Sequence, residues 1–256
     1  NDGSQNYRRV TTLLGGLPKP ALVGWGIKSV AEFAIEHKDE WVNLPKADQL
    51  KLLKGAPYSK RDAAGDRGSA IHAALEAVVK DTPLPDNLTE DEDACAAAAM
   101  GFLGELGGTF LATELIVLRL STPSYAGTLD LWHVADDGTT SIIDYKSSKA
   151  VYGDHGVQQT AYANAEYALL NAEPIDGKDD SYRGKLIEWK PEYAQKLSVV
   201  HVEPTGTTMY TVRDPEKLWK IFRAAAFIKG WQLDTDSFRG KTPREEVYET
   251  PIHLEA

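Results

Sequence analysis

The chain has 256 residues, of which 42% are hydrophobic and 26% charged, and this ordinary balance excludes wholesale disorder. A formal net charge of −10 argues against indiscriminate binding of nucleic acid through a uniformly basic surface, although it does not exclude a local basic groove. The single cysteine, Cys95, excludes an internal disulfide and an iron–sulfur cluster held by four cysteines of this chain.

The first part of the chain is predicted to be helical. A helix is expected from about residue 22 to 37, and apolar residues recur at helical spacing within 59–81. A polar loop at 82–94 carries acids that suit the start of the next helix. Glycines and Glu105 interrupt the most apolar run, 94–115, which favours a packed helix and turn over a membrane span.

The middle of the chain changes to a β pattern. Three β-rich runs follow, at 112–121, 124–135 and 139–148, and Asp136-Asp137-Gly138 predicts a hairpin between the last two. The remaining elements are expected to be a helix over 156–172, a hairpin built from 196–204 and 208–214, and a helix over 215–233. This order predicts an α/β domain whose central sheet is flanked by helices.

The predicted strands carry two acids and a lysine. Asp144 and Lys146 are two residues apart, so they share one face of a strand, and the hairpin places Asp130 on the neighbouring strand. Carboxylates of this kind can bind a hard cation, and the lysine can orient or help deprotonate an attacking water, as hydrolysis of a phosphodiester requires. The alternative is a surface Asp–Lys pair, but the apolar flanks indicate a substantially buried strand.

Other polar pairs lie on predicted helices. His72 shares a helix face with Glu76, and Gln158 shares one with Tyr162, because each pair is four residues apart. His72 is a candidate metal ligand or a hydrogen-bonded structural histidine, whereas Gln158 and Tyr162 could hold a phosphate or belong to the core. Glu114 is of interest only if its strand lies beside those of the other acids.

Together these residues form a series that resembles a known superfamily: Gly68-x3-His72, Glu114, Gly-Thr-x-Asp130, Asp144-x-Lys146 and Gln158-x3-Tyr162. The series is similar to the PD-(D/E)XK nucleases, and specifically to the RecB-type branch with its GxxxH and QxxxY motifs. The resemblance extends over about 67–168, and the N-terminal segment 7–25 also resembles phage and actinobacterial exonucleases. The iron–sulfur subtype of this branch is not expected, because it needs four cysteines.

The resemblance implies a single domain over 1–256 with a mixed central sheet. Its parts would be a helical N-terminal region (1–66), the motif-bearing core (67–170) and C-terminal strands with a helix (171–256). It also implies a role for each site residue. Mg²⁺ or Mn²⁺, as one or two ions, would be bound by His72, Asp130, Asp144 and the backbone carbonyl of Tyr145; Lys146 would position the water, Glu114 would act directly or through water, and Gln158 and Tyr162 would support the core or the DNA.

The function expected from this resemblance is a metal-dependent deoxyribonuclease, specifically an exonuclease on linear or single-stranded DNA ends in phage or bacterial recombination and repair. Alternatives are a structure-specific or restriction-like endonuclease and a non-catalytic DNA-binding subunit. A recombination or single-strand-binding partner, a homo-oligomer, no membrane and a cytoplasmic location, in a bacterial cell with a bacterial or phage gene, are also expected. Basic residues that could line a DNA groove are Lys60, Arg61, Arg67, Lys146, Lys149 and Arg183.

Overall fold

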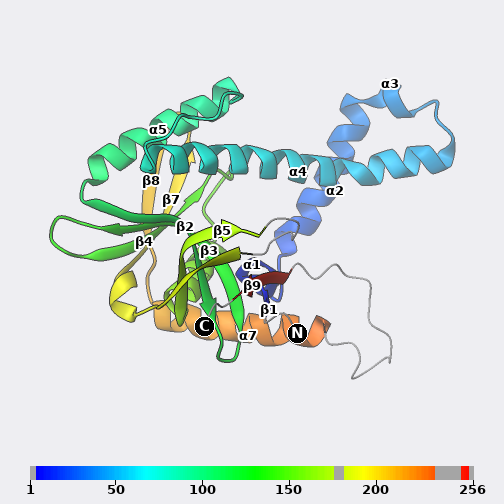
Figure 1. Ribbon diagram of the computed structural model, residues 1–256. Helices are drawn as coiled ribbons and strands as arrows, with labels where there is room; N and C mark the ends of the chain where they lie inside the picture. Colours follow the sequence, from blue (N-terminus) through cyan, green and yellow to red (C-terminus); the bar gives the residue numbers. More distant parts are fainter. Residues whose placement is uncertain (1–3, 176–181, 234–248, 254–256) are drawn as a thin grey trace.

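A mixed β-sheet forms the centre of the molecule (Figure 1). The computed structural model describes residues 4–175, 182–233 and 249–253, and within these the sheet has nine strands in the order β1-β9-β6-β5-β2-β3-β4-β7-β8. The pairs β4–β7 and β6–β9 are parallel and the other neighbours are antiparallel. The strands are β1 (Ser4–Arg8), β2 (Thr109–Arg119), β3 (Tyr125–Val134), β4 (Thr140–Lys146), β5 (Tyr167–Pro174), β6 (Tyr182–Glu188), β7 (Lys196–Glu203), β8 (Gly206–Thr211) and β9 (Glu249–His253).

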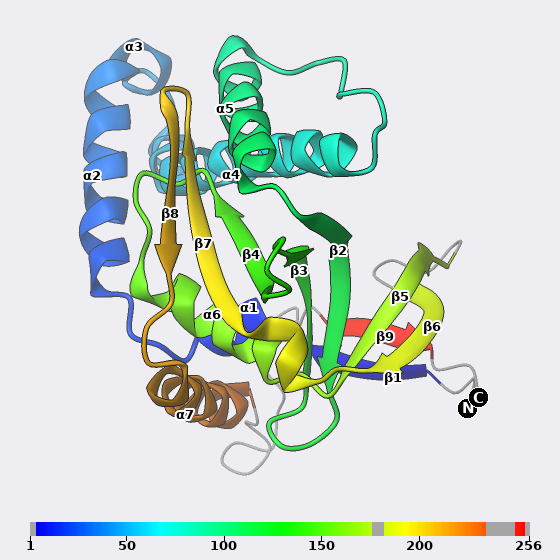
Figure 2. The same cartoon turned by 90° about the vertical axis from the view of Figure 1, so that its left-hand side faces the viewer.

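Helices cover both faces of this sheet, so the α/β class with a mixed, helix-flanked sheet is confirmed (Figures 1 and 2). On one side, α4 and α5 pack against the sheet through what we call the α4–α5 core, which includes Ile71, Leu75, Cys95, Leu131, Ile143 and Tyr145. On the other side, the α6–α7 core includes Leu115, Leu129, Ile142, Ala161, Tyr162 and Phe222. The helices are α1 (Val10–Leu14), α2 (Pro20–Glu36), α3 (Lys38–Trp41), α4 (Lys46–Val79), α5 (Glu90–Leu106), α6 (Gly153–Ala163) and α7 (Pro215–Leu233), with a short 3₁₀ helix at Pro191–Ala194.

The predicted hairpin between β3 and β4 is confirmed. The two strands pair antiparallel, and the Ala135 amide donates to the Thr139 carbonyl at 2.9 Å across the turn. Gly138 adopts a left-handed backbone with φ of +82°, which glycine adopts at little cost. The turn therefore fixes the register that places Asp130 and Asp144 on adjacent strands.

Helix α5 begins at Glu90, within the stretch 82–94 that was expected to be a loop. The Thr89 side chain accepts a hydrogen bond from the Glu92 amide, and the Glu92 carboxylate accepts one from the Thr89 amide at 2.8 Å. This reciprocal capping satisfies two amides that helical bonding leaves free at the N-terminus. The four acids of the first turn add a favourable interaction with the helix dipole.

One expectation about elements was wrong. The predicted helix over 156–172 ends at Ala163, and Tyr167–Pro174 forms β5 instead, where Leu169 is buried beside Ile116 of β2. A short apolar run fits both a helix and a strand, and here pairing with β2 decides in favour of the strand. The N-terminal region, expected to be helical, also contributes β1, which pairs with β9 from the other end of the chain.

Helix α4 connects two parts of the molecule. Its 34 residues give it a length of about 50 Å, so its first half lies with α2 and α3 beyond the edge of the sheet in Figure 1 and its second half covers the sheet. Ile71, Ala74 and Leu75 bury the second half against the sheet and thereby fix the position of His72. Among the described helices, none is both long enough and apolar enough to cross a membrane.

Candidate metal centre

Strands β3 and β4 separate at the two predicted acids. Their pairing runs from Val134–Thr140 to Leu131–Ile143, so it stops one residue before Asp130 and Asp144. Beyond this point the Tyr145 amide donates to Asp130 Oδ2 at 2.7 Å, so a carboxylate replaces the strand carbonyl as acceptor. Strand β4 stays paired with β7 as far as Lys146. The acids therefore lie at a fork between two strands.

Strand β3 and its neighbour β2 are both irregular at the level of Asp130. Leu129 belongs to the α6–α7 core whereas Leu131 belongs to the α4–α5 core, although residues two apart in a regular strand share a face. The backbone must therefore turn at Asp130. Opposite it, between the pairs Thr113–Leu131 and Leu115–Leu129, Glu114 has a left-handed φ of +50°, which costs a non-glycine residue about 1–2 kcal/mol. Backbone strain of this kind is typical of functional sites.

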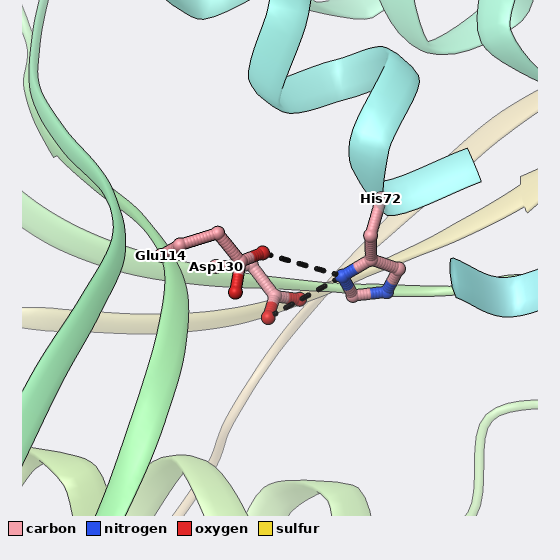
Figure 3. A group of neighbouring side chains, drawn as sticks. All are labelled: His72, Glu114 and Asp130. Carbon is pink, nitrogen blue, oxygen red and sulfur yellow. Dashed lines mark ion pairs between the residues drawn. The ribbon is translucent and has the colours of Figure 1, made fainter. Parts of the chain in front are cut away.

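Three side chains meet at this irregularity (Figure 3). His72 Nδ1 lies 3.6 Å from Asp130 Oδ1 and 3.8 Å from Glu114 Oε1, and one ligand atom from each of the three residues lies within 4.8 Å of the others. His72 comes from α4, Glu114 from β2 and Asp130 from β3. The fold thus brings three potential metal ligands together from positions that are far apart in the sequence.

The second nitrogen of His72 fixes the ring. Nε2 lies 3.1 Å from the Tyr145 carbonyl oxygen, and since a carbonyl can only accept, Nε2 carries the proton. Burial would lower the pKa of His72, but Asp130 and Glu114 outweigh it and raise this pKa to about 9. The metal-free protein therefore holds a protonated imidazole at neutral pH, and a cation that binds Nδ1 has to displace its proton.

Asp144 is the most deeply buried acid of the site. Its side chain is inaccessible to solvent, Lys146 Nζ lies 2.5 Å from Oδ2 as an ion pair, and neither carboxylate oxygen has a hydrogen-bond partner of good geometry among the described residues. Burial and the charge of Asp130 raise the pKa of Asp144 to about 6, in spite of Lys146. Burial likewise raises the pKa of Asp130 above its ordinary value, although the charges of His72 and Lys146 oppose this shift.

This arrangement suits a divalent cation. The fork holds three carboxylates against one ammonium and one imidazolium, which leaves one negative charge in excess. Buried negative charge is costly, and a cation near Asp130 and Asp144 would offset this excess. Oxygen donors favour Mg²⁺ or Mn²⁺, and a histidine nitrogen shifts the preference toward Mn²⁺. Asp144 lies outside the close group of three ligand atoms, whereas Glu114 lies inside it.

Gln158 and Tyr162 lie next to the acids on α6. Gln158 Nε2 donates to Tyr162 Oη at 2.7 Å, and both side chains are buried. Burial raises the pKa of Tyr162 and the charge of Asp144 raises it further, so the phenol lies within electrostatic range of the fork. The Tyr162 ring packs on Gly127, where an added Cβ would lie only 2.5 Å from Cε1. The glycine of "GTLD" thus makes room for this ring.

The other motif positions on α4 have different surroundings. Gly68 faces the segment after β4, and Arg67 donates to the Ser147 carbonyl at 2.9 Å, so this turn of the helix packs on the end of β4. Glu76 pairs with Lys80 and does not join the group around His72. The helix therefore presents only His72 to the fork.

Most of the predicted groove cations lie in ion pairs. Lys60 pairs with Glu32, Arg61 with Asp62, Arg67 with Asp91 and Arg183 with Glu173; Lys146 belongs to the fork, and Lys149 is exposed. These pairs weaken the case for a groove made of those residues.

The sequence analysis did not single out His155 on α6, whose pKa is lowered by burial and then by the nearby charge of Lys146. A histidine one turn before Gln158 was the available signal.

Comparison with known proteins adds little. No protein-family model matches the chain, and no curated protein does. One solved structure, described as the crystal structure of SSO0001, is 18% identical and matches over 88% of this chain and 76% of that one, with a TM-score of 0.36. A likeness this weak carries no argument, so functional reasoning depends on the site itself.

Proposed function

We propose that this chain is a metal-dependent deoxyribonuclease of the PD-(D/E)XK type, with RecB-like motifs, that hydrolyses DNA phosphodiester bonds. The observation that carries the proposal is Asp144. Its buried carboxylate has no hydrogen-bond partner of good geometry in the part of the chain that the structure describes, lies in the field of Asp130 and pairs with Lys146 where two strands separate. A structural ion pair has no need of a second buried acid, whereas a site for a cation and a phosphate does.

The ligands of the cation would be Asp130, Asp144, Glu114 and His72 Nδ1. When bound, a divalent cation supplies positive charge that offsets the charge developing on the phosphoryl oxygens. The Tyr145 carbonyl accepts from His72 Nε2, on the side of the ring away from Nδ1, so it would not bind the cation that Nδ1 holds. Its role is to orient the imidazole through this hydrogen bond, as carbonyl acceptors do for histidine ligands in metal sites.

Lys146 acts on the attacking water as a cation. Burial would lower its pKa, but Asp144 and Asp130 outweigh burial and raise it above the ordinary lysine value. The side chain therefore stays protonated at neutral pH and orients the water without removing its proton. Asp144 fixes the ammonium at 2.5 Å, and on the same face α6 supplies Gln158 and Tyr162 to steady the strand being cut.

Cleavage by matched variants tests this proposal. We expect the wild-type protein to cut labelled linear DNA with Mg²⁺ or Mn²⁺ and to be inactive in EDTA. Lys146→Met and Asp144→Asn should each lower the single-turnover rate at least about 100-fold, as loss of a catalytic group does. Lys220→Met removes an exposed lysine of α7 that is not among the predicted groove residues, and this variant should cut at the wild-type rate. Equal rates for Lys146→Met and Lys220→Met would refute the assigned site.

The exonuclease assignment is tested separately, because it derives from the resemblance alone. An exonuclease should degrade linear DNA and leave covalently closed circles intact. Cutting of closed circles would replace the exonuclease assignment with the endonuclease one and would leave the metal-dependent mechanism in place.

A further inference from the structure

A pocket of about 280 Å³ lies along the edge of β3 that β4 leaves. Its lining combines Gly127 and Thr128 of β3, Ile116 of β2, Tyr162 of α6 and Tyr182 of β6 with the N-terminal residues Arg9, Val10 and Thr11. Arg9 forms an isolated bridge to Ala126, and this contact holds the N-terminal segment against the free edge of β3. The pocket is therefore built from the N-terminal segment together with residues from the middle of the chain.

The pocket lies next to the metal centre along strands β2 and β3. Ile116 pairs with Thr128, and Glu114 and Asp130 lie two residues further along the same two strands, a distance of about 7 Å. Tyr162 links the two regions, because its ring lines the pocket while its hydroxyl accepts from Gln158 within the field of Asp144. If a phosphate of a bound DNA strand lay at the fork, the next nucleotide of that DNA would lie at this pocket.

The lining has the chemistry of a nucleotide site. Arg9 is the one charged residue among the described lining residues, and an arginine can hold a phosphate with two parallel hydrogen bonds. Tyr182, Ile116 and Val10 offer apolar and aromatic surface to a base or sugar, as in sites for single strands. The volume lies near the lower end of the range of about 300–1,000 Å³ for small-ligand pockets, which suits one nucleotide unit.

We propose that this pocket binds one nucleoside monophosphate unit of the DNA strand, adjacent to the phosphodiester at the fork, with its phosphate on Arg9. The inference rests on the proposed nuclease function. The unit is either the 5′-terminal nucleotide or an internal one, since both present the same sugar, base and phosphate. The pocket thereby fixes which bond of the strand reaches Lys146.

Binding of fluorescent single-stranded DNA in EDTA tests this proposal without depending on cleavage. Arg9→Gln should weaken binding about tenfold and reduce the salt slope of log K by about 0.7, as loss of one phosphate contact does. Thr11→Trp places a large side chain at the pocket from an exposed position of α1 and should weaken binding similarly. The matched control is Arg8→Gln: it changes the net charge equally, but Arg8 extends toward Gly230 of α7, so binding should stay within about twofold of the wild type.

Three single-stranded DNA ligands distinguish a 5′-terminal nucleotide in the pocket from an internal one. A penalty for Arg9→Gln with 5′-phosphorylated DNA alone assigns the pocket to a terminus, and an equal penalty with 5′-hydroxyl and circular strands assigns it to an internal nucleotide. Equal weakening by Arg9→Gln and Arg8→Gln, or wild-type binding by Thr11→Trp, would overturn the pocket assignment while metal-dependent cleavage persisted. If the wild-type protein did not cut DNA with Mn²⁺, although Arg9→Gln still weakened DNA binding, the nuclease function would be refuted instead.

Discussion

Among single residues, His72 and Asp144 define the site, because the pKa of each is raised above its ordinary value. His72 is protonated between two carboxylates, and Asp144 is buried without a hydrogen-bond partner of good geometry among the described residues. Both groups bind protons more tightly in the folded protein than they would in water. A cation at the fork would replace those protons, which links folding, pH and metal binding at the same residues.

The metal-free protein should therefore lose stability as pH rises. The folded pKa of His72 is about 9 against an ordinary 6.5, so its contribution is complete below pH 6.5 and disappears as pH rises through 9. The folded pKa of Asp144 is about 6 against 3.8, so ionising it destabilises the fold as pH rises through that range. Urea unfolding in EDTA should show both declines, with His72→Gln removing the upper one and Asp144→Asn the lower one. A stability that increases between pH 6.5 and 9 in the wild type would contradict these assignments.

The left-handed backbone at Glu114 predicts an inverted order of two variants. In an ordinary strand glycine is less stable than alanine by about 0.5–1 kcal/mol. At a φ of +50° alanine bears the steric penalty and glycine does not, so Glu114→Gly should be more stable than Glu114→Ala by about 1 kcal/mol. Chemical denaturation measures the difference, and the ordinary strand order would show that the backbone at Glu114 is unstrained. Both variants lack the carboxylate and should bind Mn²⁺ more weakly.

At the scale of elements, the site depends on helices that approach the fork from opposite faces of the sheet. Helix α4 brings His72 from the α4–α5 side, and α6 brings Tyr162 from the α6–α7 side. Gly127 lets the Tyr162 ring lie directly on β3, whereas Gly68 has only an ordinary contact near Ser147. A side chain at position 127 would therefore meet the Tyr162 ring, whereas position 68 has room for one.

This difference predicts different outcomes for two alanine substitutions. Gly127→Ala would place Cβ 2.5 Å from Tyr162 Cε1, so it should destabilise the protein by about 1–3 kcal/mol and move the ring away from the fork. Gly68→Ala meets nothing closer than Ser147 Oγ at 3.8 Å and should leave the melting temperature unchanged or slightly higher, because alanine favours helix. Equal losses in the two variants would show that the Tyr162 contact is not tight.

The sequence predicted local elements better than long-range pairing. The hairpin at Asp136-Asp137-Gly138 has a local signal in its turn residues and is confirmed, whereas α5 begins inside the stretch 82–94 that was expected to be a loop. Strand β5 was missed because its apolar run fits two periodicities, and β1 because its partner β9 lies at the other end of the chain. At the site, the predicted hairpin placed Asp130 and Asp144 on adjacent strands. The left-handed Glu114 and the Arg9 pocket arise from tertiary contacts that no short pattern encodes.

At the scale of the whole molecule, a cation at the fork would connect β2, β3, β4 and α4, which belong to two layers of the fold. Binding to the folded state alone stabilises it by about 2.7 kcal/mol when the ligand is at 100 times its Kd. For a chain of this size that corresponds to a rise of about 5–10 °C in melting temperature. Mn²⁺ should therefore shift the wild-type melting curve upward, and Asp130→Asn should remove most of the shift. Asp86→Asn, an exposed loop acid, should retain it.

The fork between β3 and β4 is the expected position of the catalytic cation. Anomalous diffraction from crystals of the protein soaked in Mn²⁺ would locate the ion. We expect an anomalous peak within coordination distance of Asp130 and Asp144, with His72 Nδ1 or Glu114 completing the protein ligands. A fully soaked crystal with no peak at the fork, or with its strongest peak elsewhere on the chain, would contradict it.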